Sequence, residues 1–107
     1  MAQAGTQGAS AMADLERRAG EAARLLKLLA NENRLLILCR LAVEREMTVG
    51  ALVKAVGLSQ SALSQHLAKM REDGLVATRR EAQAVHYRIA DPDARRVLTL
   101  LKNIYCP

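Results

Sequence analysis

The chain has 107 residues, half of them apolar, which is enough for one domain with its own core. It contains 17 Leu and 19 Ala but no Phe or Trp, and this composition favours a mainly helical fold over a sandwich or barrel. The net charge of +5 suits a polyanionic partner without requiring one. No apolar run reaches the roughly eighteen residues that span a membrane. Residues 1–13 lack the basic start of a secretory signal, and two cysteines are too few for a disulfide scaffold, so we expect a cytoplasmic protein with free thiols.

We expect residues 1–13 to form a disordered N-terminal tail. The segment consists mostly of small side chains and has no apolar periodicity. No internal repeat and no further shift in composition follow it. Residues 14–107 are therefore predicted to form one domain.

Two apolar helices are predicted at the start of this domain. Asp14 is a candidate cap for a helix that runs to about residue 30, and its apolar stripe, which includes Leu15 and Leu26, is expected to be buried. Asn31 is a candidate cap for a second helix over about 32–43. This second segment is apolar almost all round, which is typical of a helix in the middle of a fold.

A pair of helices with a short turn between them follows a charged connector. The first is expected over 48–56 and is stopped by Gly57. The second is expected over 59–73, with Ser59 as its cap and Gly74 after its end. A tight pair of this kind predicts a helix-turn-helix unit, whose second helix enters the major groove of DNA.

The second helix of the pair carries a polar face beside its apolar stripe. Ser and Gln side chains are short and form hydrogen bonds with base edges and phosphates, so they suit a helix that lies in a groove. A solvated face of a surface helix has the same composition, and this alternative stays open at this point. The candidate DNA contacts on this helix are Ser59, Gln60, Ser61, Ser64, Gln65, His66 and Lys69.

The pattern then changes from the period of a helix to that of a strand. Residues 75–80 and 85–89 are predicted to be the strands of a hairpin, because apolar and polar side chains alternate along the second one. Such a hairpin can place cations beside phosphates. Its candidate DNA contacts are Arg79, Arg80, His86 and Arg88. A last helix is predicted from Asp91 or Pro92 to about Tyr105, which gives an order of four helices, two strands and one helix.

Several segments together resemble the ArsR family, also called ArsR/SmtB, of bacterial winged helix-turn-helix repressors. The resemblance covers roughly residues 22–105. It rests on LANENRLLIL at 29–38, LSQSALSQHL at 58–67, GLV and RRE within 74–81, and HYRI at 86–89. It implies a homodimer built from the first and last helices that binds an imperfect palindrome in double-stranded operator DNA. The excess apolar surface on those two helices supports a dimer independently.

We find no metal site of the kinds that this family uses. The segment TVGAL at 48–52 holds no ligand, and the last helix offers Asp91 and Asp93 but no His. Zinc needs about four donors, which these two carboxylates cannot supply. His66 and His86 fall within the DNA-binding segments, so neither is expected to be a ligand, and no cofactor is predicted.

Cys39 and Cys106 are the two cysteines of the chain. Taken singly, Cys39 is a small apolar residue on a Leu-rich helix, and Cys106 is a free thiol near the chain end. The resemblance adds a second interpretation. A sulfide- and persulfide-responsive branch of the family, the BigR/SqrR type, carries one cysteine on the second helix and one on the last. In that branch reactive sulfur joins the thiols through a disulfide or polysulfide bridge and lowers DNA affinity, which implies that Cys39 and Cys106 are a redox-sensing pair.

Other functions remain open on the sequence. A repressor with this fold could respond instead to peroxide or disulfide stress, or to a soft metal such as As(III) bound by thiols. It could also be a protein-interaction adaptor that does not bind DNA. A thiol enzyme would need an activating base or a CxxC motif, and the sequence has neither, so we predict that the chain is not an enzyme.

Overall fold

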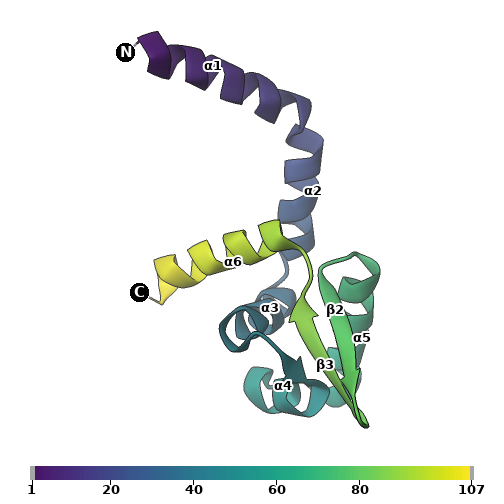
Figure 1. Cartoon of the computed structure of the whole chain (residues 1–107). Coiled ribbons are helices and arrows are strands. Elements are labelled where there is room, and N and C mark those ends of the chain that lie inside the picture. Colours follow the sequence, from purple (N-terminus) through teal and green to yellow (C-terminus); the bar gives the residue numbers. More distant parts are fainter. Residues whose placement is uncertain (1, 107) are drawn as a thin grey trace.

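The computed structural model describes residues 2–106, and Figure 1 shows a helical body around a small sheet, with helical arms on one side. The elements are α1 (Ala2–Arg17), α2 (Ala19–Leu29), α3 (Glu32–Glu44), β1 (Met47–Thr48), α4 (Val49–Val56), α5 (Gln60–Glu72), β2 (Val76–Glu81), β3 (Ala84–Ile89) and α6 (Pro92–Tyr105). The predicted mainly helical class is confirmed. Helices α4 and α5 form the expected helix-turn-helix, and the β2–β3 hairpin is its wing.

Side-chain caps begin four of the helices. Asn31, Thr48, Ser59 and Asp91 each precede a helix, and a side-chain oxygen of each accepts a backbone N–H from the first turn. Pro92 follows the last of these caps, where its missing N–H costs no helical hydrogen bond. These local signals explain why the predicted helix starts after residue 30 lie within about one residue of the observed ones.

Two glycines end the helices of the helix-turn-helix. Gly57 and Gly74 have φ values of 72° and 79°, in the left-handed region that residues with a Cβ rarely adopt. After Gly74 the chain turns back, and the N–H of Leu75 donates to the carbonyl of Met70 at 2.9 Å. This turn directs the chain from α5 into the hairpin.

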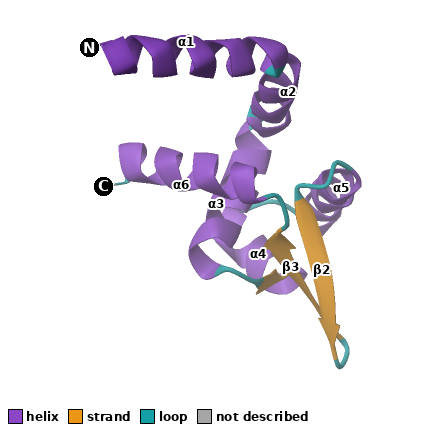
Figure 2. Cartoon of the chain, turned by 45° about the horizontal axis from the view of Figure 1, so that its top comes forward, coloured by secondary structure: helices purple, strands orange, loops and turns teal. Residues whose placement is uncertain are grey.

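The sheet has three antiparallel strands in the order β1-β3-β2. The hairpin register ends with Glu81 opposite Ala84, and Thr48 of β1 lies opposite His86 on the other side of β3. We did not predict β1, because a strand of two residues shows no alternation. Figure 2 shows the hairpin extending away from the helical body.

One core joins the elements from α2 to α6. It consists of aliphatic side chains and one methionine. Its buried members are Leu29, Ile37, Leu38, Leu41, Leu52, Leu63, Leu67, Met70, Leu75, Val76, Ile89, Ala94 and Leu98. Helix α5 and the hairpin both contribute buried side chains to this core. The packing of these side chains therefore fixes the position of the helix relative to the buried end of the hairpin.

The N-terminal region corrects two predictions. The segment expected to be a disordered tail is helical from Ala2 onward, and Met1 lies outside the described residues. Ala is the strongest helix former, so an Ala-rich segment can be helical without an apolar periodicity. Asp14 does not cap a helix, because it lies inside α1 and pairs there with Arg17. Helix α2 instead begins after Arg18, without a side-chain cap.

The apolar stripe expected to be buried on the first helix is exposed. Leu15 on α1 and Leu26 on α2 are 51% and 58% exposed, because the α1–α2 arm extends away from the core (Figure 1). The radius of gyration of 16.7 Å also exceeds the value of about 13 Å expected for a compact chain of this length. The single chain therefore does not cover its own apolar surface.

Candidate nucleic-acid interface and thiol pair

Helix α5 buries one stripe and exposes its polar face. Leu63, Leu67 and Met70 are fully buried, which fixes the rotation of the helix. Of the predicted contacts, His66 is half-buried, and those that are exposed are Ser59, Gln60, Ser61, Ser64, Gln65 and Lys69. The structure therefore brings these hydrogen-bonding side chains together on the exposed face of α5 and its cap.

Three of the four predicted contacts on the hairpin are exposed, namely Arg79, Arg80 and Arg88. Arg80 and Arg88 are exposed, and neither has an ion pair among residues 2–106. Arg80 lies opposite Val85, next to the turn and beyond the core. Both guanidinium groups are therefore available to an external anion such as a phosphate.

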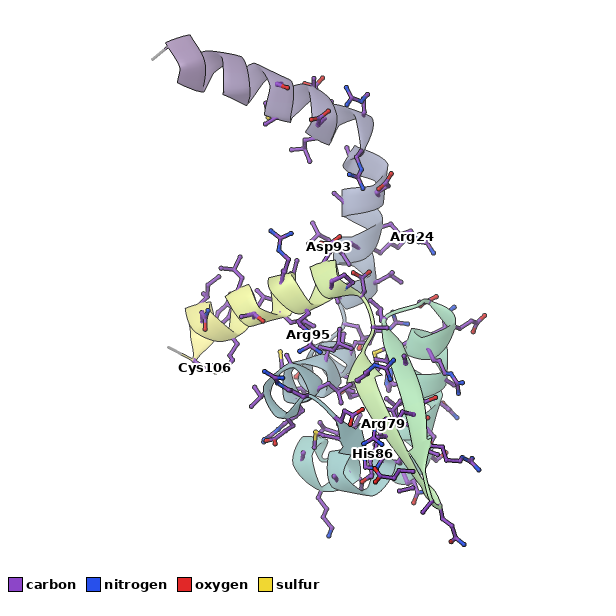
Figure 3. All side chains as sticks on the ribbon, in the orientation of Figure 1. Arg24, Arg79, His86, Asp93, Arg95 and Cys106 are labelled. Carbon is purple, nitrogen blue, oxygen red and sulfur yellow. The ribbon has the colours of Figure 1, made fainter. Side chains whose placement is uncertain are left out.

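Arg79 is bound to two carboxylates of its own chain. It donates to both carboxylate oxygens of Glu46 at 2.9–3.1 Å and to Glu81 Oε2 at 2.8 Å. The cross-strand neighbour of Arg79 is His86, which is half-buried, and Figure 3 shows these two side chains close together. Arg79 and His86 therefore lie within the hairpin network and are less available to an external anion than Arg80 and Arg88.

These contacts lower the pKa of both carboxyl groups. Hydrogen bonds from Arg79 are the main cause for Glu46 and for Glu81, and the charge of His86 acts in the same direction on each. The same contacts raise the pKa of Arg79. We did not identify Glu46 from the sequence, because nothing local to it indicates a partner 33 positions away.

The two cysteines lie on helices that pack against each other. Cys39 is half-buried on α3, and Cys106 is exposed at the end of α6, which crosses α3 in Figure 1. Burial raises the pKa of the Cys39 thiol, and the charge of Cys106 raises it further. Both thiols therefore lie on the packed pair of helices α3 and α6.

The carboxylates near the start of α6 have other partners. Asp91 caps the helix, and Asp93 pairs with Arg96 at 3.6 Å. Across the described part of the chain, no three His, Cys, Asp or Glu side chains gather into a group that could hold a metal ion. No helix within residues 2–106 combines the length and apolar character needed to cross a membrane.

Two helical arms, which are α1–α2 and α6, carry apolar side chains that the chain itself leaves uncovered. On α6 these are Leu100, Ile104 and Tyr105, and Leu26 is similarly exposed on α2. An open groove of about 600 Å³ lies between the α1–α2 arm and the start of α6, with both apolar and charged side chains in its walls. Exposed apolar surface of this kind is typical of an interface with another protein.

Comparisons with known proteins agree with this fold. Residues 31–78 match a family model described as bacterial regulatory protein, arsR family. The chain is 48% identical over 93 residues to the transcriptional activator HlyU of Vibrio cholerae, covering 87% of this chain and 85% of that protein. It is 42% identical over 93 residues to the biofilm growth-associated repressor of Xylella fastidiosa, covering 87% of this chain and 81% of that protein.

Solved structures of these two proteins have the same fold. BigR from Xylella fastidiosa has a TM-score of 0.80 at 41% identity, covering 90% of this chain and 97% of that chain. Reduced HlyU from Vibrio cholerae has a TM-score of 0.80 at 48% identity, covering 88% of this chain and 98% of that chain. These relatives are transcriptional regulators, which confirms the predicted resemblance. The chain belongs to the ArsR family of DNA-binding transcriptional regulators.

Proposed function

We propose that this regulator is a homodimeric repressor that releases its operator when reactive sulfur bridges Cys39 and Cys106. The observation that carries the proposal is the packing of helix α3, which holds Cys39, against helix α6, which ends at the exposed Cys106. As a bacterial DNA-binding protein it would act in the cytoplasm. The proposal has three parts, which are the DNA contact, the dimer and the thiol chemistry.

The DNA contact is made by α5 and the hairpin. The exposed Ser and Gln side chains of α5, in particular Ser64 and Gln65, would read base edges in the major groove. Arg80 and Arg88 would bind phosphates, which positions the protein without reading sequence. In a dimer with two-fold symmetry the two recognition helices enter successive major grooves about 34 Å apart, so the operator is an imperfect palindrome.

The dimer is built from the helical arms. A second copy of the chain would cover the exposed apolar side chains of α1, α2 and α6. Helices α1 and α6 extend toward the same side of the molecule in Figure 1. A two-fold interface of this kind uses the same surface on both subunits, so one exposed patch is enough to form it. The exposed position of Leu26 and Leu100 in the single chain supports this arrangement.

The thiol chemistry begins at Cys106, because it is exposed and Cys39 is partly covered. The Cys106 thiolate attacks the outer sulfur of a donor persulfide, RSSH, which leaves as the thiol RSH. The Cys39 thiolate then attacks Sγ of Cys106, which is the inner sulfur of this persulfide. The outer sulfur leaves as hydrosulfide, and a Cys39–Cys106 disulfide forms. Alternatively, the Cys39 thiolate attacks the outer sulfur of a second donor persulfide, and RSH leaves. The Cys39 persulfide formed in this way attacks Sγ of Cys106 and releases hydrosulfide, so the bridge contains one additional sulfur atom.

The bridge affects DNA binding because it joins the dimer arm to the DNA-binding body. Helix α6 belongs to the proposed interface, and α3 packs against α4 and β3. Tying the end of α6 to α3 would change the angle between the two DNA-reading halves of the dimer. A loss of tenfold to a thousandfold in affinity needs only roughly 1.4–4 kcal/mol of coupling.

The test is a mobility shift with a duplex that the wild-type protein has selected from a random-sequence library. We expect a persulfide donor to release this duplex from the wild type, whereas Cys106→Ser and Cys39→Ser bind it normally and do not respond. Mass spectrometry of the treated protein should show one added sulfur atom for each sulfur inserted in the bridge. Release of DNA from Cys106→Ser by the donor would refute the dithiol mechanism.

Parallel treatments separate the alternatives. Hydrogen peroxide would release DNA with loss of two hydrogens and no added sulfur if the signal is oxidative stress. As(III) would release it through an adduct that denaturation removes. Failure to bind any duplex at low salt would favour a protein-interaction adaptor over a DNA-binding repressor.

A further inference from the structure

We propose that Glu46 is a positioning residue for DNA binding. Through its ion pair with Arg79, it holds the hairpin in the orientation, relative to α5, in which the hairpin binds DNA. Arg79 then binds Glu46 within the chain and does not contact DNA. The inference rests on the proposed function in one respect, which is that the hairpin contacts DNA. Glu46, Arg79 and Glu81 form the network that carries it.

The geometry of this network is unusually complete for a surface ion pair. Arg79 engages both oxygens of Glu46 through two of its nitrogens, and its third nitrogen binds Glu81. Exposed ion pairs contribute little as a rule, but bidentate geometry and a network of several charges are the exceptions. The pair connects the segment after α3 with the middle of β2, so it fixes one element relative to another.

The backbone beside Glu46 is held in a conformation that needs support. Arg45 has φ 72° and ψ −54°, and the N–H of Glu46 donates to the carbonyl of Glu44 at 2.9 Å. This is a γ-turn with positive φ, which is strained for a residue with a Cβ. Strain of this kind persists where neighbouring contacts maintain it, and it gathers at functional sites. The bond to Arg79 is such a contact, and the turn directs Glu46 toward the hairpin.

The outer half of the hairpin has little other support. Val76 and Ile89 are buried at its base, whereas the residues from Arg79 to Ala84 at its outer end are all exposed. β1 pairs with β3 only at Tyr87 and His86. Among the described residues, the Glu46–Arg79 pair is the ion pair that joins the outer half of the hairpin to the rest of the fold. It would therefore set the angle at which Arg80 is presented.

The sign of one substitution separates this role from simple electrostatics. Glu46→Gln removes a negative charge from a protein that binds a polyanion, so electrostatics alone predicts tighter binding. The positioning role predicts weaker binding, because the neutral side chain loses the charged bonds to Arg79. Glu46→Asp keeps the charge but is too short for the paired contact, so it should also weaken binding.

The experiment measures affinity for the selected duplex over a range of salt concentrations. We expect Glu46→Gln and Glu46→Asp to weaken binding about threefold to tenfold, with the slope of log affinity against log salt unchanged. Glu44→Gln, which removes an exposed charge two positions away, is the matched control and should bind at least as tightly as the wild type. Arg79→Gln should match Glu46→Gln, and the double variant should lose little more.

Three results would overturn the inference. Tighter or unchanged binding by Glu46→Gln, with Arg80→Gln weakened, would refute the positioning role and leave the hairpin contact intact. A fall of about 0.9 in the magnitude of the salt slope of Arg79→Gln would show that Arg79 contacts a phosphate itself. If Arg80→Gln instead binds like the wild type, the hairpin does not touch DNA, and the proposed wing contact fails together with the inference. Circular dichroism and sedimentation of each variant verify that fold and assembly are retained.

Discussion

Arg34 on α3 and Asp73 at the end of α5 form an ion pair at 3.6 Å in which each side chain is only 15% exposed. Arg34 also donates to the carbonyl of Leu28 at the end of α2, at 3.0 Å. One guanidinium therefore connects the arm that carries the proposed dimer surface to the C-terminal end of the recognition helix. Lys69 approaches the same carboxylate at 3.7 Å from a more exposed position.

Replacing Arg34 should destabilise the fold. We expect Arg34→Met to lower the free energy of unfolding by about 2–3 kcal/mol, since it leaves a shielded carboxylate without its main counter-charge. Asp73 Oδ2 is screened from solvent and has no hydrogen-bond partner among the described residues. Urea denaturation measures the change, and Arg24→Met, on an exposed position of α2, is the control. Equal and small losses in both variants would contradict the role assigned to Arg34.

Truncation of the polar face of α5 should weaken specific DNA binding. We expect Gln65→Ala or Ser64→Ala to cost about 1–3 kcal/mol on the selected duplex, the range for losing a good contact to a base edge. Binding to a duplex of unrelated sequence should change little. Ser10→Ala, an equivalent change on exposed α1, should have no effect on either duplex. Loss of affinity for both duplexes alike would show that these side chains do not read bases.

Charges placed on the last helix should dissociate the dimer. Leu100 and Ile104 are 59% and 56% exposed, and a buried glutamate without a partner is costly in an interface. We expect Leu100→Glu or Ile104→Glu to sediment as monomers at concentrations where the wild type is a dimer. Val43→Glu changes a residue of similar exposure on α3 and serves as the control. Dimers that persist in both α6 variants would rule out this face as the interface.

The reactivity of Cys39 should depend on Cys106. Because burial and the charge of Cys106 both raise the pKa of Cys39, its alkylation should reach half-maximal rate at a lower pH in Cys106→Ser than in the wild type. Tyr105→Phe keeps both thiols and should leave the profile unchanged. Mass spectrometry of the alkylated peptides over a pH series gives the two curves, and coincident curves would contradict electrostatic contact between the thiols.

The same pKa shift has a defined effect on stability. Cys39 holds its proton more tightly in the folded chain than in the unfolded chain. The contribution of Cys39 to the free energy of unfolding is therefore fully present below the pKa of the thiol in the unfolded chain. It is lost as the pH rises through the higher pKa of the thiol in the folded chain. Alkaline conditions should weaken the fold at this position, and Cys39→Ser should remove that dependence.

The sequence predicts those parts of the fold that local chemistry determines. Asn31 and Ser59 are caps, and Gly57 and Gly74 end helices, because each residue type satisfies a need of the backbone at that point. The exposed face of α5 follows from the spacing of its buried leucines.

Features that depend on distant partners could not be predicted in this way. β1 forms because Met47 and Thr48 pair with the otherwise unpaired edge of β3. Glu46 binds Arg79 because folding brings the two residues together. Leu15 and Leu26 have the spacing of a buried stripe, but residues 2–106 leave both side chains exposed. Periodicity identifies an apolar face and does not identify what covers it.

Cys106 follows the whole helix-turn-helix and hairpin, and it lies 67 positions after Cys39. A covalent link between the two would thus enclose most of the domain in one ring. In the chain-entropy description, a ring of this size stabilises the folded protein by about 4 kcal/mol by restricting the denatured ensemble. Without DNA, the bridged protein would then melt at a higher temperature than the reduced protein. Its lifetime in a cell would be set by the supply of reductant and not by spontaneous unfolding.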